Sequence, residues 1–186
     1  MGPTMNLLRE VFSHICGQQH CWVLGGMTLP LCERCTGLYV GAFFGLILVL
    51  AFRPRPRVLV YWIHGWFMLI MLPFGFHLVA HGGLMRTVTG ALFAFGLVYY
   101  LALNPLTLWH FWGSDSVRRT GGYLLMLALM VTVLLAAICS GGIWAAWILT
   151  VFAVAGAFAL LGCAAVNVAI LPRTLRILRH PAESSV

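Results

Sequence analysis

The sequence predicts an all-α integral membrane protein, a helical bundle of about five transmembrane helices with an N-terminal extracytoplasmic Cys/His-rich segment. Of its 186 residues, 62% are hydrophobic and only 8% are charged, and the mean hydropathy is +0.98. Soluble domains carry about 25% charged residues. The apolar residues fall into five runs, each close to the roughly 20 residues that a helix needs to cross a bilayer. Because no linker separates these runs into groups, the chain predicts one membrane domain.

The first fifteen residues predict an amphipathic helix that lies along the membrane surface or packs on the bundle. Arg9, Glu10 and His14 interrupt this segment, so it lacks the continuous apolar core of a cleaved signal peptide. Its apolar residues recur at helical spacing and share one face. They are Leu7, Leu8, Val11 and Ile15.

Five candidate spans follow, and the gaps between them are short. Their expected bounds are residues 36–52, 58–79, 87–106, 121–139 and 143–171. In the first span, Gly37, Gly41 and Gly45 recur every four residues, a spacing that lets a second helix approach closely. The chain is therefore divided into an N-terminal helix and Cys/His segment (1–35), a five-span bundle (36–171) and a basic tail (172–186).

The arginines predict the orientation of the bundle. The chain has no lysine, and eight of its eleven arginines fall on one side of a five-span arrangement. The positive-inside rule places that side, with the C-terminus, in the cytoplasm, and places the N-terminus outside the cell membrane. The eight are Arg53, Arg55, Arg57, Arg118, Arg119, Arg173, Arg176 and Arg179. Arginines spread over short gaps do not make a nucleic-acid-binding face, so no nucleic-acid partner is expected.

Four of the six cysteines lie in a short segment in front of the first span, together with a histidine. Cys16 and His20 form a C-x-x-x-H pair, and Cys32 and Cys35 form a C-x-x-C pair. Together they make a Cys3His set, which is a usual tetrahedral complement for zinc. Copper(I) and iron also accept thiolate and imidazole, whereas calcium and magnesium prefer oxygen ligands that this chain largely lacks. The turn formers Gly25–Gly26 and Pro30 predict that the chain folds back and joins the two pairs.

The predicted orientation brings three further candidates to the same side. His77 and His81 end the second span and, being four residues apart, share a helix face. Cys139 ends the fourth span. All three are candidate neighbours of the metal site.

Other polar residues near the spans predict structural roles. His64 and His110 lie near the arginine-rich side and are expected at the membrane interface. Asn167, a lone amide in the last span, predicts a hydrogen bond between helices.

Three functional hypotheses stay open on the residues alone. The first is an extracytoplasmic Cys3His metal site, with zinc as first choice, which can be purely structural. The second is a membrane thiol–disulfide redox protein that uses Cys32 and Cys35. The third is a non-catalytic accessory or lipid-binding subunit, with a membrane protein or a second copy as partner besides the bilayer. No motif assigns a catalytic residue, and the question whether the protein is an enzyme stays open.

One stretch resembles the signature of a bacterial family. The run Leu29-Pro30-Leu31-Cys32-Glu33-Arg34-Cys35-Thr36-Gly37-Leu38-Tyr39-Val40-Gly41 is similar to the P-x-C-x-R-C-x-G-x-Y-x-G pattern of the domain-of-unknown-function family numbered 2085, predicted multi-pass membrane proteins. Arg86-Thr87-Val88-Thr89-Gly90 is similar to the family's R-x-x-T-G, and the resemblance covers roughly residues 12 to 96. Many members place a histidine directly after the first cysteine, whereas here Gly17 follows Cys16. The resemblance implies a membrane location and the importance of the motif, and it implies no reaction.

Overall fold

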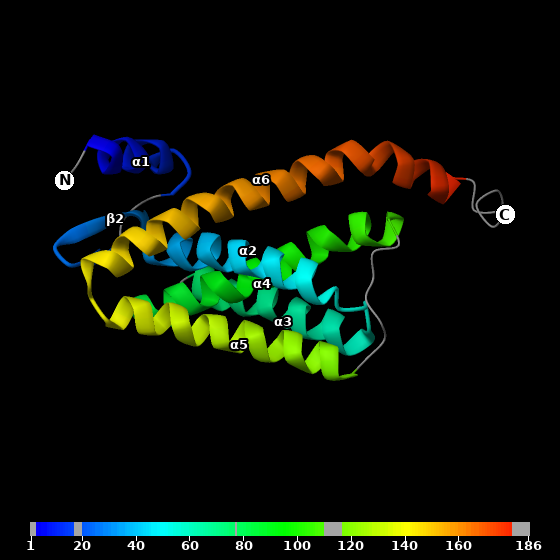
Figure 1. The fold of residues 1–186 in the computed structure, drawn as a ribbon, viewed down its shortest axis with the longest axis horizontal. Coiled ribbons are helices and arrows are strands. Elements are labelled where there is room, and N and C mark those ends of the chain that lie inside the picture. Colours follow the sequence, from blue (N-terminus) through cyan, green and yellow to red (C-terminus); the bar gives the residue numbers. More distant parts are fainter. Residues whose placement is uncertain (1–2, 17–19, 77, 110–116, 180–186) are drawn as a thin grey trace.

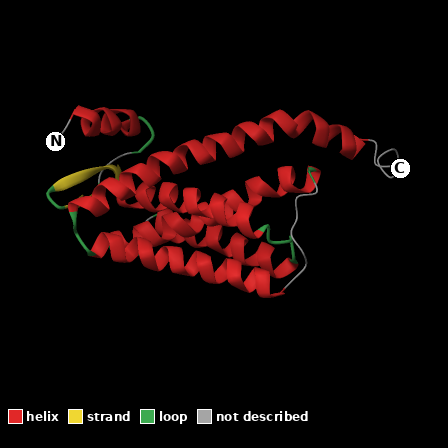
Figure 2. Ribbon diagram, in the orientation of Figure 1, coloured by secondary structure: helices red, strands yellow, loops and turns green. Residues whose placement is uncertain are grey.

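The computed structural model describes residues 3–16, 20–76, 78–109 and 117–179, and in this part of the chain long helices dominate (Figures 1 and 2). Five helices are long and apolar enough to cross a membrane, which confirms the predicted all-α membrane bundle. They are α2 (Glu33–Phe52), α3 (Val58–Gly75), α4 (Gly83–Leu108), α5 (Val117–Cys139) and α6 (Ile143–Arg179). A short helix, α1 (Pro3–Ser13), and a hairpin of β1 (Cys21–Leu24) and β2 (Met27–Cys32) precede them.

The ends of the helices differ from the hydropathy limits in two instructive ways. Helix α3 ends at Gly75, four residues before the expected limit. The hydropathy limit lay farther along because apolar residues continue beyond the end of the helix. Helix α6 continues to Arg179, eight residues past the expected limit, because a helix can carry on into the polar tail outside the apolar layer. Hydropathy therefore locates the membrane layer, whereas backbone hydrogen bonding sets the helix length.

The hairpin is the one feature of the fold that the sequence analysis did not name. Its strands pair Leu24 with Met27 and Cys21 with Cys32. Gly25 and Gly26 form the turn with φ values of +56° and +76°, the left-handed pair that a two-residue hairpin requires. The expected fold-back at these glycines is confirmed, whereas Pro30 lies inside β2, opposite the irregular stretch of the ladder, and makes no turn.

Helix α1 packs on the rest of the protein, and of the predicted apolar face only Leu8 takes part in that contact. Met5 and Phe12 are buried against β2 and join the core that α6 shares. Leu7, Val11 and Ile15 are exposed. The helix therefore packs on the hairpin and leaves an apolar stripe outward.

Helices α2, α4 and α6 all begin at the end of the bundle that carries the hairpin, called here the hairpin end (Figure 1). The opposite end, where α2 gives way to the Arg53–Arg57 run, is called the arginine end. Helix α2 packs against both α4 and α6. A Cβ added at Gly37 would meet the carbonyl of Thr87, and one at Gly41 would lie 2.8 Å from the Cα of Ala91, so the expected close approach is confirmed.

The outer faces of the long helices are covered by large apolar side chains. Leu125, Leu161 and Val168 are each about 70% exposed. Such a surface is unfavourable in water and matches the bilayer interior. The protein is therefore a membrane protein that sits in the lipid bilayer.

Candidate metal centre

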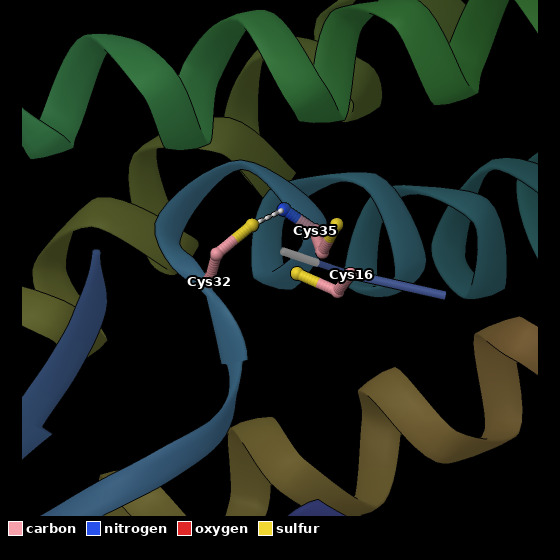
Figure 3. A group of neighbouring side chains, drawn as sticks. All are labelled: Cys16, Cys32 and Cys35. Atoms are coloured by element: carbon pink, nitrogen blue, oxygen red, sulfur yellow. Dashed lines mark hydrogen bonds between the residues drawn. The ribbon is translucent and has the colours of Figure 1, made fainter. Parts of the chain in front are cut away.

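Three thiols from three different segments converge at the hairpin end. The Sγ atoms of Cys16, Cys32 and Cys35 all lie within 4.8 Å of one another (Figure 3). Cys16 comes from the segment after α1, Cys32 is the last residue of β2, and Cys35 lies in the first turn of α2. Among the described residues, this is the group whose donor atoms are close enough to share a metal ion.

The start of α2 holds the C-x-x-C pair in place. Cys32 is the N-cap, with an extended backbone (φ −67°, ψ 161°). The backbone N–H of Cys35 donates to the Sγ of Cys32 at 3.4 Å, and the hydroxyl of Thr36 donates to the Cys32 carbonyl at 3.0 Å. The Cys35 N–H, at the positive end of the helix dipole, would stabilise a thiolate at Cys32 once a metal displaces the thiol proton.

The cluster is shielded from water on the side of Cys16. This residue is 5% exposed, while Cys32 and Cys35 are half-buried. Phe12 and Tyr39, whose ring centroids lie 5.8 Å apart, belong to the core around it. A hydrogen bond with the Cys16 thiol raises the pKa of Cys32, and burial adds to this effect against the opposing Cys35 N–H. Burial, followed by the charges of Cys32 and Cys16, likewise raises the pKa of Cys21.

His20, the expected fourth ligand, has an exposed side chain and lies outside the three-thiol group. Its backbone is nonetheless next to the site, because its carbonyl accepts a hydrogen bond of 2.8 Å from the N–H of Glu33. Cys21, which pairs with Cys32 across the hairpin, is also outside the group. The structure thus brings together three of the four expected ligands.

The expected neighbours have surroundings of their own. His81 Nε2 lies 3.4 Å from Arg34 Nη2, and its Nδ1 donates to the carbonyl of Val79 at 2.6 Å. Its ring packs edge-on against Phe74, with centroids 5.1 Å apart. Cys139 is exposed at the end of α5. His77 lies outside the described residues. His81 and Cys139 therefore share the hairpin end with the cluster without entering it.

A set of polar contacts behind the cluster ties α2 to α4. Thr87 donates to the Glu33 carbonyl at 3.0 Å, and the indole of Trp22 donates to the Thr87 hydroxyl at 3.0 Å. Arg86 forms an ion pair of 3.1 Å with Glu33, with side chains that are 21% and 15% exposed. Arg34 donates to the Phe74 carbonyl at 2.8 Å, near the end of α3. The residues around the C-x-x-C pair thus lock the beginnings of two helices together.

The expectation that His64 lies at the membrane interface is wrong, because its side chain is fully buried. Its Nδ1 donates to the Val60 carbonyl at 2.8 Å, which leaves Nε2 to accept from the hydroxyl of Tyr123 at 2.9 Å. The ring stacks on Tyr99 at 4.1 Å. A histidine at the seventh position of an apolar helix was a sign in the sequence that this residue is buried. Its partners could not be predicted, because they come from α4 and α5 and sequence order does not show which helices pack together.

The lone amide of the last span behaves as expected. Asn167 donates to the carbonyl of Leu101 at 2.7 Å and so connects α6 to α4. His110, by contrast, lies outside the described residues.

One protein-family model matches the region of the chain that carries this site. A family model described as "Predicted membrane protein (DUF2085)" matches residues 16–100. Over these residues the chain is similar to that family. The match begins at Cys16 and takes in the hairpin, α2, α3 and most of α4, so it includes all three thiols and the Glu33–Arg86 pair. Neither a curated protein nor a solved structure matches the chain.

Proposed function

We propose that this membrane protein binds one transition-metal ion, with zinc as first choice, through Cys16, Cys32 and Cys35 on the extracytoplasmic side. The observation that supports this most is the convergence of three Sγ atoms within 4.8 Å from three separate segments. Three thiolates around a zinc ion at about 2.3 Å would lie about 3.8 Å apart. Small side-chain rotations would close the cluster to that spacing.

The ion's role in this proposal is to hold the N-terminal segment on the bundle. Cys16 follows α1, whereas Cys32 and Cys35 belong to the junction of the hairpin with α2. An ion shared by all three would cross-link these parts without changing the bundle. Four protein ligands around zinc are typical of structural sites.

We assign the fourth position to His20 in the metal-bound protein. Its backbone is anchored beside Cys32 through the bond to Glu33, and its imidazole is exposed and able to rotate. Without His20, the fourth position would be open to water, as in catalytic sites. Comparing His20→Ala with wild type therefore tests whether four protein ligands close the metal site or whether one position is open to water.

The test is metal analysis of the full-length protein purified in detergent under reducing conditions. Wild type is expected to carry close to one ion per chain by mass spectrometry, and Cys32→Ser to carry none. Cys139→Ser and Cys163→Ser are matched controls, because these cysteines lie outside the cluster, and both should retain the ion. Metal-free wild type, or equal loss in the control variants, would overturn the proposal.

A second candidate function rests on the same three thiols. Cys32 and Cys35 lie at a helix N-terminus with Cys16 beside them, an arrangement also suited to disulfide exchange. In that case two thiols form a disulfide, and two electrons and two protons pass to an acceptor such as a quinone. Thiol titration before and after reductant distinguishes the two: a metal-free protein that gains two thiols on reduction supports the redox function.

The extracytoplasmic position of the site is part of the proposal and has a test of its own. Cys139 is exposed at the hairpin end and gives a handle on that side. A membrane-impermeant maleimide should label wild type in intact cells more than it labels Cys139→Ser. Equal labelling of the two, with a difference appearing only after lysis, would place the hairpin end in the cytoplasm.

A further inference from the structure

An apolar groove opens at the arginine end, between α2, α4 and α6. Its volume is about 570 Å³, within the range of about 300–1,000 Å³ typical of ligand sites. Its walls include Leu50 from α2, Leu106 from α4, and Gly162 with Cys163 from α6. The groove lies outside the metal centre and is not needed for it.

The groove exists because α6 contacts α2 closely at Gly156 but not at Gly162. At Gly156, an added Cβ would run into the carbonyl of Tyr39, so the two helices are in contact there. At Gly162, an added Cβ would meet no atom within 4 Å in the part of the chain that the structure describes. Farther along, Asn167 bonds the Leu101 carbonyl and Thr174 lies 3.3 Å from Asn104, so α6 stays tied to α4.

Small residues usually let membrane helices touch. Here Gly162 and its neighbour Cys163 face open space instead, so the residues that would allow contact line a vacant volume. The Asn167 and Thr174 contacts keep α6 attached on the far side of that volume. The groove is thus framed by fixed contacts at both ends.

One end of the groove is charged. Among the described residues that line it, Arg53 carries the one charge, and Trp109 lies at the same end. Arg53 ends α2 in a left-handed conformation (φ 47°), and its Nε donates to the Leu50 carbonyl at 3.2 Å. Arg55 and Arg57 follow, each after one proline. Arginine and tryptophan are the residues that anchor at lipid headgroup level, and basic residues there attract anionic lipids.

We propose that this groove binds one acyl chain of an anionic glycerophospholipid, with the lipid phosphate held by Arg53. The long apolar wall fits a hydrocarbon chain, and the guanidinium end is complementary to a phosphate. Lipid tails are as apolar as the groove, so the tail confers little selectivity in a bilayer. The charge of the headgroup must therefore decide which lipid is retained.

The test measures lipid retention by native mass spectrometry of the full-length protein in detergent. Phosphatidylglycerol and phosphatidylcholine with identical chains are added separately, and the fraction of protein carrying one lipid is compared. Wild type should prefer the anionic lipid by about fivefold, the effect of one arginine near a headgroup. Arg53→Gln should abolish this preference, whereas Arg55→Gln, a control from the same arginine run, should keep most of it.

A second pair of variants tests the groove itself. Gly162→Leu places a side chain in the volume and should abolish retention of the lipid. Gly121→Leu is the matched control, because its Cβ also meets open space but lies on α5 outside the groove. Both variants should elute as wild type in size exclusion, which shows that the bundle is intact.

Several outcomes would overturn the proposal. Equal retention of the two lipids by wild type would remove the role of the charge. Equal loss in Arg53→Gln and Arg55→Gln would assign the effect to diffuse surface charge. Retention by Gly162→Leu would place the lipid elsewhere, and a wild-type dimer that dissociates in Gly162→Leu would assign the groove to a second copy of the chain.

Discussion

The hairpin end and the arginine end are built from the same three helices, yet they differ in packing. At the hairpin end, α2 and α4 lie so close that Gly37 abuts the Thr87 carbonyl, and side-chain hydrogen bonds bridge their first turns. At the arginine end, α2, α4 and α6 leave a groove of about 570 Å³ between them. One bundle therefore has a closed end and an open end.

The difference shows that small residues do not by themselves decide how helices pack. Gly37 brings two backbones together because a partner helix with a polar hydrogen-bonding turn faces it. Gly162 leaves a space because α2 and α4 stand back across the groove, and an added Cβ there would meet no atom within 4 Å in the described structure. The closed end suits a site that needs fixed geometry, and the open end suits one that admits a flexible ligand.

The same substitution at the two glycines should have very different effects. Gly37→Leu forces a side chain into the Thr87 backbone and should destabilise the bundle by about 3 kcal/mol or more, since overpacked membrane helices must separate. Gly162→Leu fills open space and should leave stability unchanged or raised by about 0.5–1 kcal/mol through helix propensity. Thermal unfolding in detergent measures both. Similar losses in the two variants would show that the ends are packed alike.

Metal affinity at the closed end should rise with pH. The hydrogen bond that the Cys32 thiol makes with Cys16 raises the pKa of Cys32, so this thiol keeps its proton at neutral pH and the metal must displace it. Zinc affinity should therefore fall at least tenfold for each pH unit below neutrality, or about 1.4 kcal/mol per unit. Competition with a zinc indicator between pH 6 and 8 measures the slope. Cys139→Ser should give the same slope, and a pH-independent affinity would contradict thiol ligation.

A buried pair that joins α3 to α5, His64 and Tyr123, should also contribute to the stability of the bundle. His64→Leu leaves the buried Tyr123 hydroxyl without its partner and removes the stack on Tyr99, at a cost of about 2 kcal/mol. Tyr123→Phe alone should cost less, and the double variant should cost less than the sum of the two. Denaturation midpoints of the four proteins give the coupling. Strict additivity would show that the pair makes no shared contribution.

Some of these features could be predicted from the sequence and others could not. The apolar runs predicted five spans, because the length needed to cross a bilayer is fixed. The glycine spacing in α2 predicted a close helix contact without naming α4 as the partner. Periodicity and hydropathy report on one helix at a time, so the His64–Tyr123 pair between α3 and α5 was beyond their reach.

The candidate site shows the same division. The C-x-x-C spacing pointed to Cys32 and Cys35, since a short separation keeps two thiols together in most local structures. Cys16 joined them through a hairpin whose turn glycines were recognised but whose strands were not. The orientation of His20, in contrast, depends on a side-chain rotation that no sequence spacing fixes.

The variant with the smallest expected effect tests whether hydrogen bonds, as well as close packing, make the hairpin end more closed than the arginine end. Thr87→Val removes the hydroxyl that accepts from Trp22 and donates to the Glu33 carbonyl, and should cost about 1 kcal/mol. Thr89→Val is the matched control, because this buried hydroxyl donates only within its own helix in the described structure, to the carbonyls of Met85 and Arg86. In thermal unfolding in detergent, Thr87→Val should have a lower midpoint temperature than Thr89→Val. The fluorescence emission of Trp22 should shift in Thr87→Val alone. If both variants unfold at the same temperature with unchanged emission, the Thr87 hydrogen bonds contribute nothing to stability, and the close approach of the two backbones accounts for the closed end.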